Sequence, residues 1–224
     1  VDDLSLHIAP GEIYGFIGHN GAGKTTTLKS VAGILRFDAG EIFINGKSIK
    51  ADPVACKREM AYIPDNPDMY EFLSGIKYLN FVADIYGMTK AEREERITKY
   101  ADMFEITKDL AQPVSAYSHG MKQKLAIISA WLHEPRLILM DEPSTALDPR
   151  NRRTLIRVLR ARPETKLIAS HDLDLVLETC RRVLLIADGA LAADGPAREL
   201  LRDKALLEAN GLELPLCLAG VPEL

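Results

Sequence analysis

Apolar and polar positions follow two different spacings along the chain, and the changes of spacing predict where strands and helices lie. Short apolar runs bounded by turn residues predict strands at residues 13–17, 60–63, 136–140, 166–170 and 183–187. Apolar residues three or four positions apart predict helices at 26–32, 72–85, 120–133, 151–159 and 173–180, with a short one after Pro196. Because strands and helices alternate, the pattern predicts an α/β fold with a parallel sheet.

Four stretches depart from this alternation. Residues 1–8 alternate apolar and polar side chains and predict a strand, and residues 41–47 predict another strand that runs into an Asn-Gly turn. From residue 66 the spacing is helical, and a highly charged helix opens at Thr89, so a helical insert is predicted. We interpret the charged run 92–96 as a solvated helix face and assign it no function. From residue 212 onward no pattern predicts an element.

The helix at 26–32 follows a glycine-rich stretch that fits the phosphate-binding pattern G-x-x-x-x-G-K-[ST] at every fixed position. That stretch is Gly18-His19-Asn20-Gly21-Ala22-Gly23-Lys24-Thr25. The glycines let successive backbone N–H groups turn toward one point, and the following helix adds its positive N-terminal end, so a polyphosphate is the predicted ligand. We expect Lys24 to reach the β- and γ-phosphates and Thr25 to place its hydroxyl on Mg²⁺. The alternative is a chance glycine turn, which the flanking strand and helix disfavour.

Two carboxylates and a histidine follow other predicted strands. Asp141 and Glu142 stand at the carboxyl end of the run 136–140, where open α/β sheets bind ligands. Asp141 is predicted to help hold Mg²⁺, and Glu142 to orient or deprotonate an attacking water. Simple helix capping is the alternative for this acidic pair. His171 ends the run 166–170 and is a candidate donor to the γ-phosphate, although a lone histidine there is more often structural.

Composition narrows the class of protein. The 224 residues are 47% hydrophobic and 27% charged, which suits one large α/β domain or a core with a smaller lobe. The net charge of −4 and the lack of a basic block argue against direct binding of nucleic acid. The apolar runs are shorter than the about 18 residues that span a bilayer, so we expect no transmembrane segment, and any membrane link must go through another chain.

Cysteine usage and the first residues carry two further expectations. Three cysteines, widely separated, argue against a disulfide framework and a zinc site and fit a reducing cytoplasm. The chain opens at Val1 inside an alternating stretch, so we expect that upstream residues are missing.

Taken with the phosphate loop and Asp141-Glu142, three further motifs give the chain a family resemblance. Residues Tyr117-Ser118-His119-Gly120-Met121 resemble the signature L-S-G-G-Q, and Ser144-Thr145-Ala146-Leu147-Asp148 and His171 follow in order. The chain thus resembles the nucleotide-binding subunit of an ATP-binding-cassette (ABC) transporter, nearly end to end. The resemblance implies a P-loop NTPase (RecA-like) parallel-sheet core with an antiparallel β edge and an inserted α-helical subdomain. It divides the single ATPase domain into a nucleotide-binding core (1–65 and 125–205), a helical subdomain with the signature (66–124) and a C-terminal tail (206–224).

The resemblance also implies the site residues and the partners. Two cassettes are expected to sandwich ATP head to tail, as a homo- or heterodimer, with Ser118 and Gly120 of one touching the γ-phosphate held by Lys24 of the other. An integral-membrane permease subunit would hold the cassette in the cytoplasm at the inner face of the membrane. Residues expected to contact ATP are Gly18, His19, Asn20, Gly21, Ala22, Gly23, Lys24, Thr25, Thr26, Ser118, Gly120 and Asp148. Those expected at Mg²⁺ are Thr25, Asp141 and Asp65, and the catalytic set is Glu142, His171 and Lys24.

Three departures from the family pattern affect these expectations. His119 and Met121 stand where the signature usually has Gly and Gln, so the side chain of His119 must point away from the nucleotide. Asp65 falls where a Gln usually joins the metal site to the membrane partner; an Asp can still bind Mg²⁺ but adds a charge. The aromatic residue that stacks on adenine in the family is expected before Val1.

The leading function is therefore an ATPase that powers a membrane transporter, in the exporter branch, where signatures of the form S-x-G-M-K-Q-[KR] recur. The alternatives are a soluble ABC-type ATPase switch acting on ribosomes or DNA, and an ATP-binding regulator that does not hydrolyse. Relatives of the switch class usually carry two cassettes or a coiled-coil insert, and neither is visible here. Intact Lys24, Asp141, Glu142 and His171 disfavour the regulator. The segment 65–73 is predicted to line the groove for a short helix of the permease, through Met69, Tyr70, Phe72 and Leu73.

Overall fold

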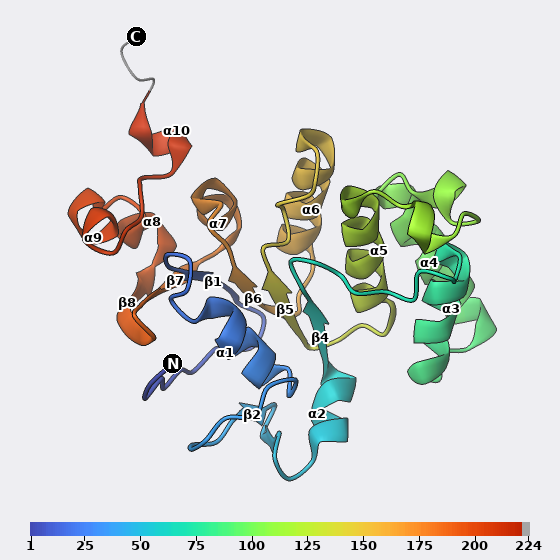
Figure 1. Cartoon of the computed structure of the whole chain (residues 1–224), viewed down its shortest axis with the longest axis horizontal. Coiled ribbons are helices and arrows are strands. Elements are labelled where there is room, and N and C mark those ends of the chain that lie inside the picture. Colours follow the sequence, from blue (N-terminus) through green and yellow to red (C-terminus); the bar gives the residue numbers. More distant parts are fainter. Residues whose placement is uncertain (221–224) are drawn as a thin grey trace.

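A six-stranded sheet lies at the centre of the computed structural model, which describes residues 1–220 (Figure 1). The strand order is β4-β5-β6-β1-β7-β8. The strands are β1 (Ile13–Ile17), β4 (Met60–Ile63), β5 (Leu137–Asp141), β6 (Thr165–Ala169), β7 (Arg182–Ala187) and β8 (Ala190–Pro196). All neighbours pair in parallel except β7 and β8, which are antiparallel at the edge. The predicted parallel α/β sheet with an antiparallel edge is confirmed.

Helices cover both faces of the sheet, which explains why the strands are almost continuously apolar. On one face lie α1 (Lys24–Val31) and α2 (Pro53–Glu59); on the other lie α5 (His119–Leu132), α6 (Pro149–Ala161) and α7 (Leu173–Thr179) (Figure 1). Each face has its own apolar cluster, and successive residues of a strand belong to opposite ones. In β5, Ile138 and Met140 pack on the α5 side and Leu139 on the α1 side.

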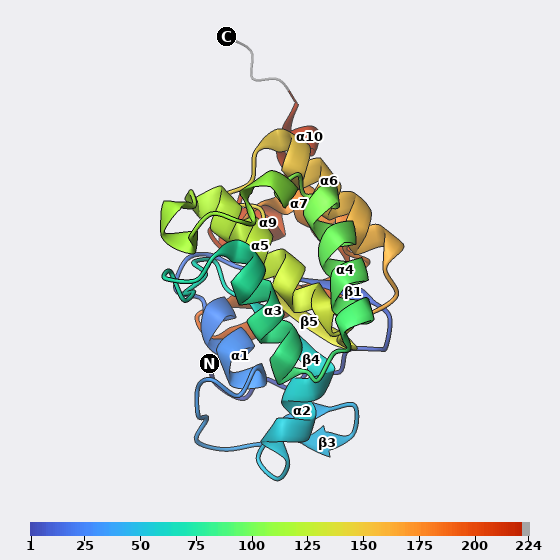
Figure 2. The same ribbon diagram turned by 90° about the vertical axis from the view of Figure 1, so that its right-hand side faces the viewer.

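The predicted helical insert consists of α3 (Gly75–Ile85), α4 (Lys90–Met103) and two single turns, η1 (Thr107–Asp109) and η2 (Val114–Ala116), beside α5 (Figure 2). Thr89 starts α4 through a capping box with Glu92, as the charged segment requires. Apolar residues of these helices, such as Leu79 and Tyr100, belong to the same cluster as Trp131 of α5 and the α5 face of the sheet. The insert is thus packed continuously against the core.

The strand predicted at residues 1–8 is wrong. This segment is irregular in the structure, and the backbone of Asp2 donates one hydrogen bond to Gly189, at 3.0 Å. The side chains of Leu4, Leu6 and Ile8 still pack on the α1-side cluster, which accounts for their alternation. Burial on one side sets the apolar pattern, but a strand also needs a pairing partner, and none of the described strands pairs with residues 1–8.

The remaining elements are short. The turn Asn45-Gly46, with both residues at positive φ, joins β2 (Phe43–Ile44) to β3 (Lys47–Ser48) as predicted. After β8 come α8 (Ala197–Leu200), α9 (Lys204–Ala209) and α10 (Leu216–Ala219). The predicted C-terminal tail contains α10 and all of α9 except its first two residues, and residues 221–224 of the tail lie outside the described part of the chain. Among residues 1–220, no helix has the length and apolar content to cross a bilayer.

Candidate functional site

The glycine-rich loop joins β1 to α1 and has the backbone that a phosphate cradle needs. Gly18, Gly21 and Gly23 all have positive φ, and a side chain at Gly18 would come within 2.2 Å of the carbonyl oxygen of Ile186. Lys24 folds back over the loop, where its Nζ donates to the carbonyl oxygens of Gly18 (2.6 Å) and His19 (3.1 Å). A phosphate oxygen can replace these carbonyl acceptors, since both offer a lone pair to the same ammonium.

Charge around Lys24 is balanced by two carboxylates. Burial lowers the pKa of Lys24, while the nearby charges of Glu142 and Asp141 act in the opposite direction. Lys24, Glu142 and Asp141 are therefore close enough to interact through space, although they come from α1 and the end of β5. The parallel strands bring these three side chains together, because the carboxyl ends of β1, β5 and the β6 strand between them lie at the same edge of the sheet.

Asp141 is the most constrained carboxylate of the site. Asp141 is only 1% exposed. Its Oδ2 accepts a hydrogen bond from the hydroxyl of Tyr62 at 3.4 Å, and its Oδ1 is buried without a hydrogen-bond partner. Burial is the main reason why the pKa of Asp141 is raised; the charges of Asp65 and Glu142 add to the rise, and the hydroxyl of Thr25 opposes it. A buried carboxylate oxygen without a donor, next to a hydroxyl, fits a hard cation such as Mg²⁺.

Within residues 1–220, no group of three or more His, Cys, Asp or Glu side chains is close enough to enclose a metal ion. Mg²⁺ usually binds through one or two carboxylates together with water and substrate phosphates. Asp65 is exposed, and its Oδ1 accepts the backbone N–H of Asn66 at 2.8 Å. Its charge reaches Asp141, so the two predicted metal carboxylates do share one neighbourhood.

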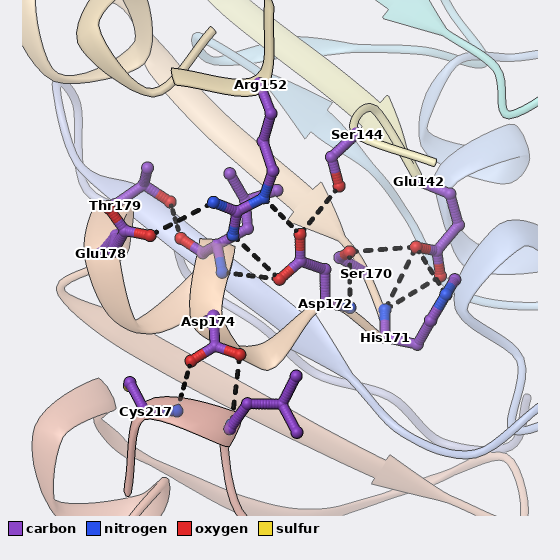
Figure 3. A network of polar contacts seen from close by, with 12 residues as sticks. Glu142, Ser144, Arg152, Ser170, His171, Asp172, Asp174, Glu178, Thr179 and Cys217 are labelled. Atoms are coloured by element: carbon purple, nitrogen blue, oxygen red, sulfur yellow. Dashed lines mark hydrogen bonds and ion pairs between the residues drawn. The ribbon is translucent and has the colours of Figure 1, made fainter. Parts of the chain in front are cut away.

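Glu142 and His171 form a hydrogen-bonded pair across the β5 and β6 ends (Figure 3). Nδ1 of His171 lies 2.8 Å from Oε2 of Glu142, and the backbone N–H of His171 reaches both carboxylate oxygens at 3.0 and 3.1 Å. The hydroxyl of Ser170 donates to Oε2 at 2.9 Å. The Glu142 side chain is 16% exposed and the His171 side chain 62% exposed, so the pair lies at the surface where a nucleotide can approach.

The signature segment starts α5 and contacts two other predicted site segments. Ser118 caps the helix by accepting the N–H of Met121 at 3.3 Å, and Nε2 of His119 lies 3.2 Å from the carbonyl oxygen of Asp65. A Cβ at Gly120 would lie only 2.6 Å from the carbonyl oxygen of Ala146, so this position needs glycine. The backbone of the signature thus packs against the 144–148 loop, and the ring of His119 is turned toward Asp65.

Asp148 caps α6, where its carboxylate accepts the N–H groups of Arg150 and Asn151 and the side-chain amide of Asn151. Those hydrogen bonds hold the pKa of Asp148 below its usual value.

Among the predicted site residues, the structure brings six into one neighbourhood: Lys24, Thr25, Asp65, Asp141, Glu142 and His171. Ser118, Gly120 and Asp148 are instead engaged with neighbours in α5, α6 and the 144–148 loop.

The sequence does not predict four residues of the site: Tyr62, Arg152, Ser170 and Asp172. Ser170 and Asp172 flank His171 in the sequence, which is the one local signal that could have indicated them. Tyr62 and Arg152 reach the site only through the fold, from β4 and α6.

A groove of about 440 Å³ lies beside the site, between the sheet and the helical insert. It is lined by Ala61, Tyr62, Asp68, Met69, Tyr70, Tyr78, Phe81, Val82, Ile85, Tyr86, Ser129, Ala130 and His133. Of the predicted docking residues, Met69 is buried and Leu73 half-buried, whereas Tyr70 (51% exposed) and Phe72 (80% exposed) face solvent. Phe81 and Ile85 of α3 are exposed as well, and Tyr70 packs edge-on against Phe81. Exposed apolar side chains therefore lie together along one side of the groove.

Several known proteins are similar to this chain in sequence or in fold. The sequence model of the family described as ABC transporter matches residues 1–145. A putative ABC transporter ATP-binding protein of Synechocystis is 37% identical over 97% of this chain and 76% of its own length. The ABC-type transporter ATP-binding protein EcsA of Bacillus subtilis is 32% identical over 92% of this chain and 85% of its own. A solved structure described as the ATP binding subunit of an ABC transporter superposes with a TM-score of 0.85 at 32% identity, covering 94% and 88% of the two chains.

Proposed function

This chain belongs to the ABC transporter family and is an ATP-binding ATPase subunit of that family, and we propose that it passes the energy of hydrolysis to a membrane permease from a site completed by a second cassette. The observation that supports this most is the meeting of Lys24, Asp141, Glu142 and His171 at one edge of the sheet. That combination joins a phosphate cradle, a buried carboxylate and a base, which are the parts that phosphoryl transfer to water requires.

Each residue has a role that follows from its contacts. Lys24 exchanges its two carbonyl acceptors for β- and γ-phosphate oxygens, and the N–H groups of the 18–24 loop hold the rest of the polyphosphate. Glu142 accepts a proton from the water that attacks the γ-phosphorus, and the bond from that phosphorus to the bridging oxygen breaks to leave ADP and phosphate. His171, whose backbone N–H donates to Glu142, keeps that carboxylate oriented. In its imidazolium form the ring donates from Nδ1 to Glu142 and from Nε2 to the γ-phosphate.

We propose Mg²⁺ as the cofactor, held by Asp141 and Thr25 with Asp65 nearby. The fit rests on the unpartnered, buried Oδ1 of Asp141 and on the oxygen-only donor set. When bound, Mg²⁺ neutralises charge on the β- and γ-phosphates. A bound cation also relieves the unfavourable burial of the Asp141 charge.

The second cassette supplies what this chain's own phosphate loop lacks. Ser118 stands at the N-terminus of the 14-residue helix α5, and it leads directly into His119 and Gly120; Ser118 and His119 are exposed and Gly120 is half-buried. The hydroxyl, the close backbone at Gly120 and the positive helix end make an anion site that points away from the packed core. In a head-to-tail dimer, this site and Asp148 of one copy face the γ-phosphate bound by Lys24 of the other.

Mixing two inactive variants tests the composite site. Lys24→Ala loses phosphate binding and Ser118→Arg blocks the signature, so each homodimer should be inactive, while the isolated Ser118→Arg chain still binds ATP. In a mixed dimer one of the two sites contains both defects and the other contains neither, so up to half of the wild-type activity should return. Full activity of Ser118→Arg alone contradicts the head-to-tail arrangement.

We propose that the groove beside the site receives a short helix of the permease. Tyr70, Phe81 and Ile85 line it with exposed apolar surface, and exposed Phe72 packs against the ring of Tyr70. The wall of the groove also includes Tyr62, whose hydroxyl donates to Asp141. The charge of Asp65 acts on Asp141, and Asp68, three residues further along the chain, lines the groove, so this segment can report nucleotide binding to the docked helix. The groove can therefore bind the permease helix on one side while Tyr62 in its wall contacts Asp141 of the proposed metal site.

The double variant Tyr70→Ala/Phe72→Ala tests this surface. It should release the cassette from membranes or uncouple transport while ATP binding by the isolated subunit persists, because both side chains are exposed and contribute little to the core. A matched control is Phe43→Ala, which removes an aromatic ring of similar exposure on β2, away from the groove. If the double variant stays bound to membranes and transports normally, this groove is not the docking surface.

Three further proposals complete this function. The single ATPase domain divides into a nucleotide-binding core at 1–65 and 125–205, a helical subdomain with the signature at 66–124, and a C-terminal tail at 206–224. The assembly belongs to the exporter branch, supported by the sequence Met121-Lys122-Gln123-Lys124 after Ser118-His119-Gly120. Through the permease, the chain lies in the cytoplasm at the inner face of the membrane; co-purification with tagged protein tests that placement.

A further inference from the structure

The contacts of Glu142 extend into a polar network that reaches α6 and α7 (Figure 3). At its centre is the carboxylate of Asp172, the residue after His171. Arg152 of α6 binds it with two nitrogens, Nε to Oδ2 at 2.9 Å and Nη2 to Oδ1 at 3.0 Å. Ser144, two residues after Glu142, donates to Oδ2 at 3.1 Å, and the N–H of Leu175 donates to Oδ1 at 2.9 Å. Asp172 thus ties together the loops that follow β5 and β6.

Opposing influences act on the charge of this carboxylate. Burial pushes its pKa upward, and the bidentate bond from Arg152 together with the Leu175 N–H outweighs burial, so the pKa of Asp172 lies below its usual value. Arg152 also reaches Glu178 at 3.3 Å, so the guanidinium is held from two sides. The Asp172 carboxylate is therefore ionised at neutral pH and is held by the hydrogen bonds from Arg152, Ser144 and Leu175.

Ser170 connects this anchored residue to Glu142, and the direction of its hydrogen bonds is determined. Its Oγ accepts the backbone N–H of Asp172 at 3.0 Å. A hydroxyl has one proton to give, and the remaining contact, to Oε2 of Glu142 at 2.9 Å, is with an acceptor-only carboxylate. The Ser170 proton therefore points at Glu142. Ser170 is fully buried, so water cannot compete for that proton.

We propose that Ser170 is a positioning residue for hydrolysis, which holds the Glu142 carboxylate by its hydroxyl, and that the Arg152–Asp172–Ser144 clamp fixes Ser170 and the loop after Glu142 in register. The proposal rests on Glu142 as the base. Glu142 needs such support because its φ is +48°, in the left-handed region that a side chain disfavours, and its carboxylate must keep one orientation to take a proton from water.

The test compares turnover and ATP affinity in the purified full chain with Mg²⁺ and ATP. Ser170→Ala should lower kcat about tenfold and leave the Kd for ATP within twofold, since Ser170 contacts Glu142 and no part of the 18–24 loop. Ser170→Thr, which keeps the hydroxyl, should recover most of the turnover. Thr179→Val is the matched control: it removes a buried hydroxyl of the next helix, bonded to the carbonyl of Leu175, and should leave kcat unchanged.

A combination with Glu142→Gln separates this proposal from the function it rests on. If Ser170 acts through Glu142, adding Ser170→Ala to Glu142→Gln should change the residual single-turnover rate by less than twofold. An equal loss in both backgrounds, or wild-type kcat for Ser170→Ala beside a defective Glu142→Gln, overturns the positioning role alone. Normal turnover of Glu142→Gln overturns the base assignment and this proposal together.

The clamp has its own variant in case Ser170→Ala fails to fold. Asp172→Asn keeps the shape but weakens the bidentate contact with Arg152, and it leaves the buried Ser170 in place. It should lower kcat several-fold at unchanged ATP Kd, and it should not add to the effect of Ser170→Ala. Wild-type turnover of a folded Asp172→Asn overturns the role of the clamp.

Discussion

The replacement Glu142→Gln tests the chemistry most directly, because the two side chains have the same shape. The Glu142 oxygens accept hydrogen bonds from Ser170 and from the backbone N–H and Nδ1 of His171. A glutamine oxygen in the Oε2 position keeps the contacts with Ser170 and His171, while the amide nitrogen in the Oε1 position faces the backbone N–H of His171. The fold and the nucleotide cradle should therefore survive, and the proton acceptor is lost.

The expected magnitudes differ between the steps. Removal of a positioned general base typically costs about 10²–10⁴ in rate, which corresponds to about 3–5 kcal/mol in the barrier. Weakening two charge-assisted hydrogen bonds at a side chain that is 16% exposed should cost about 1 kcal/mol of folding stability. ATP binding should stay equal or tighten, because Glu142 no longer repels the γ-phosphate, although it also ceases to stabilise the Lys24 ammonium.

Three measurements separate these effects: single-turnover hydrolysis with the membrane partner present, ATP affinity by calorimetry, and the dimer fraction with ATP by size-exclusion chromatography. Slow hydrolysis, retained affinity and accumulated nucleotide-bound dimer are expected together. Asp84→Asn, which alters an exposed carboxylate paired with Arg93 in the helical insert, is the matched control for loss of one negative charge. Wild-type turnover in Glu142→Gln refutes the assignment of the base, and loss of ATP binding refutes the separation of binding from chemistry.

Two further predictions follow from the packing. Gly120→Ala should slow hydrolysis at least about tenfold and lower the unfolding free energy by about 1–3 kcal/mol, because its Cβ would lie 2.6 Å from the Ala146 carbonyl oxygen. Gly195→Ala is the control, since its Cβ would meet only Leu200, at 3.4 Å. Normal turnover of Gly120→Ala would contradict the prediction. Lys166 is fully buried, and burial lowers its pKa from 10.5 to about 8. At a pH between these two pKa values, Lys166 is protonated in the unfolded chain and neutral in the folded chain. The unfolding free energy of the wild type relative to Lys166→Met should therefore rise with pH across this window, by about 3 kcal/mol in total, and a flat difference in urea titrations from pH 7 to 11 refutes the shift.

Local sequence determined the elements whose signals are contiguous. The phosphate loop needs a strand, a turn with positive φ and a helix within about 20 residues, and all of these conditions can be checked in the sequence. The sequence predicts the five parallel strands correctly because burial on both faces leaves each of them almost continuously apolar. The capping box that starts α4 at Thr89 is equally local. For such elements the physical cause lies within a few residues.

Pairing between distant segments had to come from the tertiary structure. β8 carries Gly195 and Pro196 and no apolar alternation, and it is a strand only because β7 offers it a free edge. Residues 1–8 show the reverse case: they have the alternation, but none of the described strands pairs with them.

The same distinction holds within the site. Lys24, Asp141, Glu142 and His171 were predicted from the sequence, because each follows a recognisable strand end or loop. That Asp141 keeps one oxygen buried and unpartnered, and that Arg152 of α6 anchors Asp172 beside the Ser170 bonded to Glu142, depends on side chains from separate elements. Hydrogen-bond partners are set by three-dimensional proximity and geometry, which leave no periodic mark in the sequence, so only the folded arrangement of β5, β6, α6 and α7 decided them.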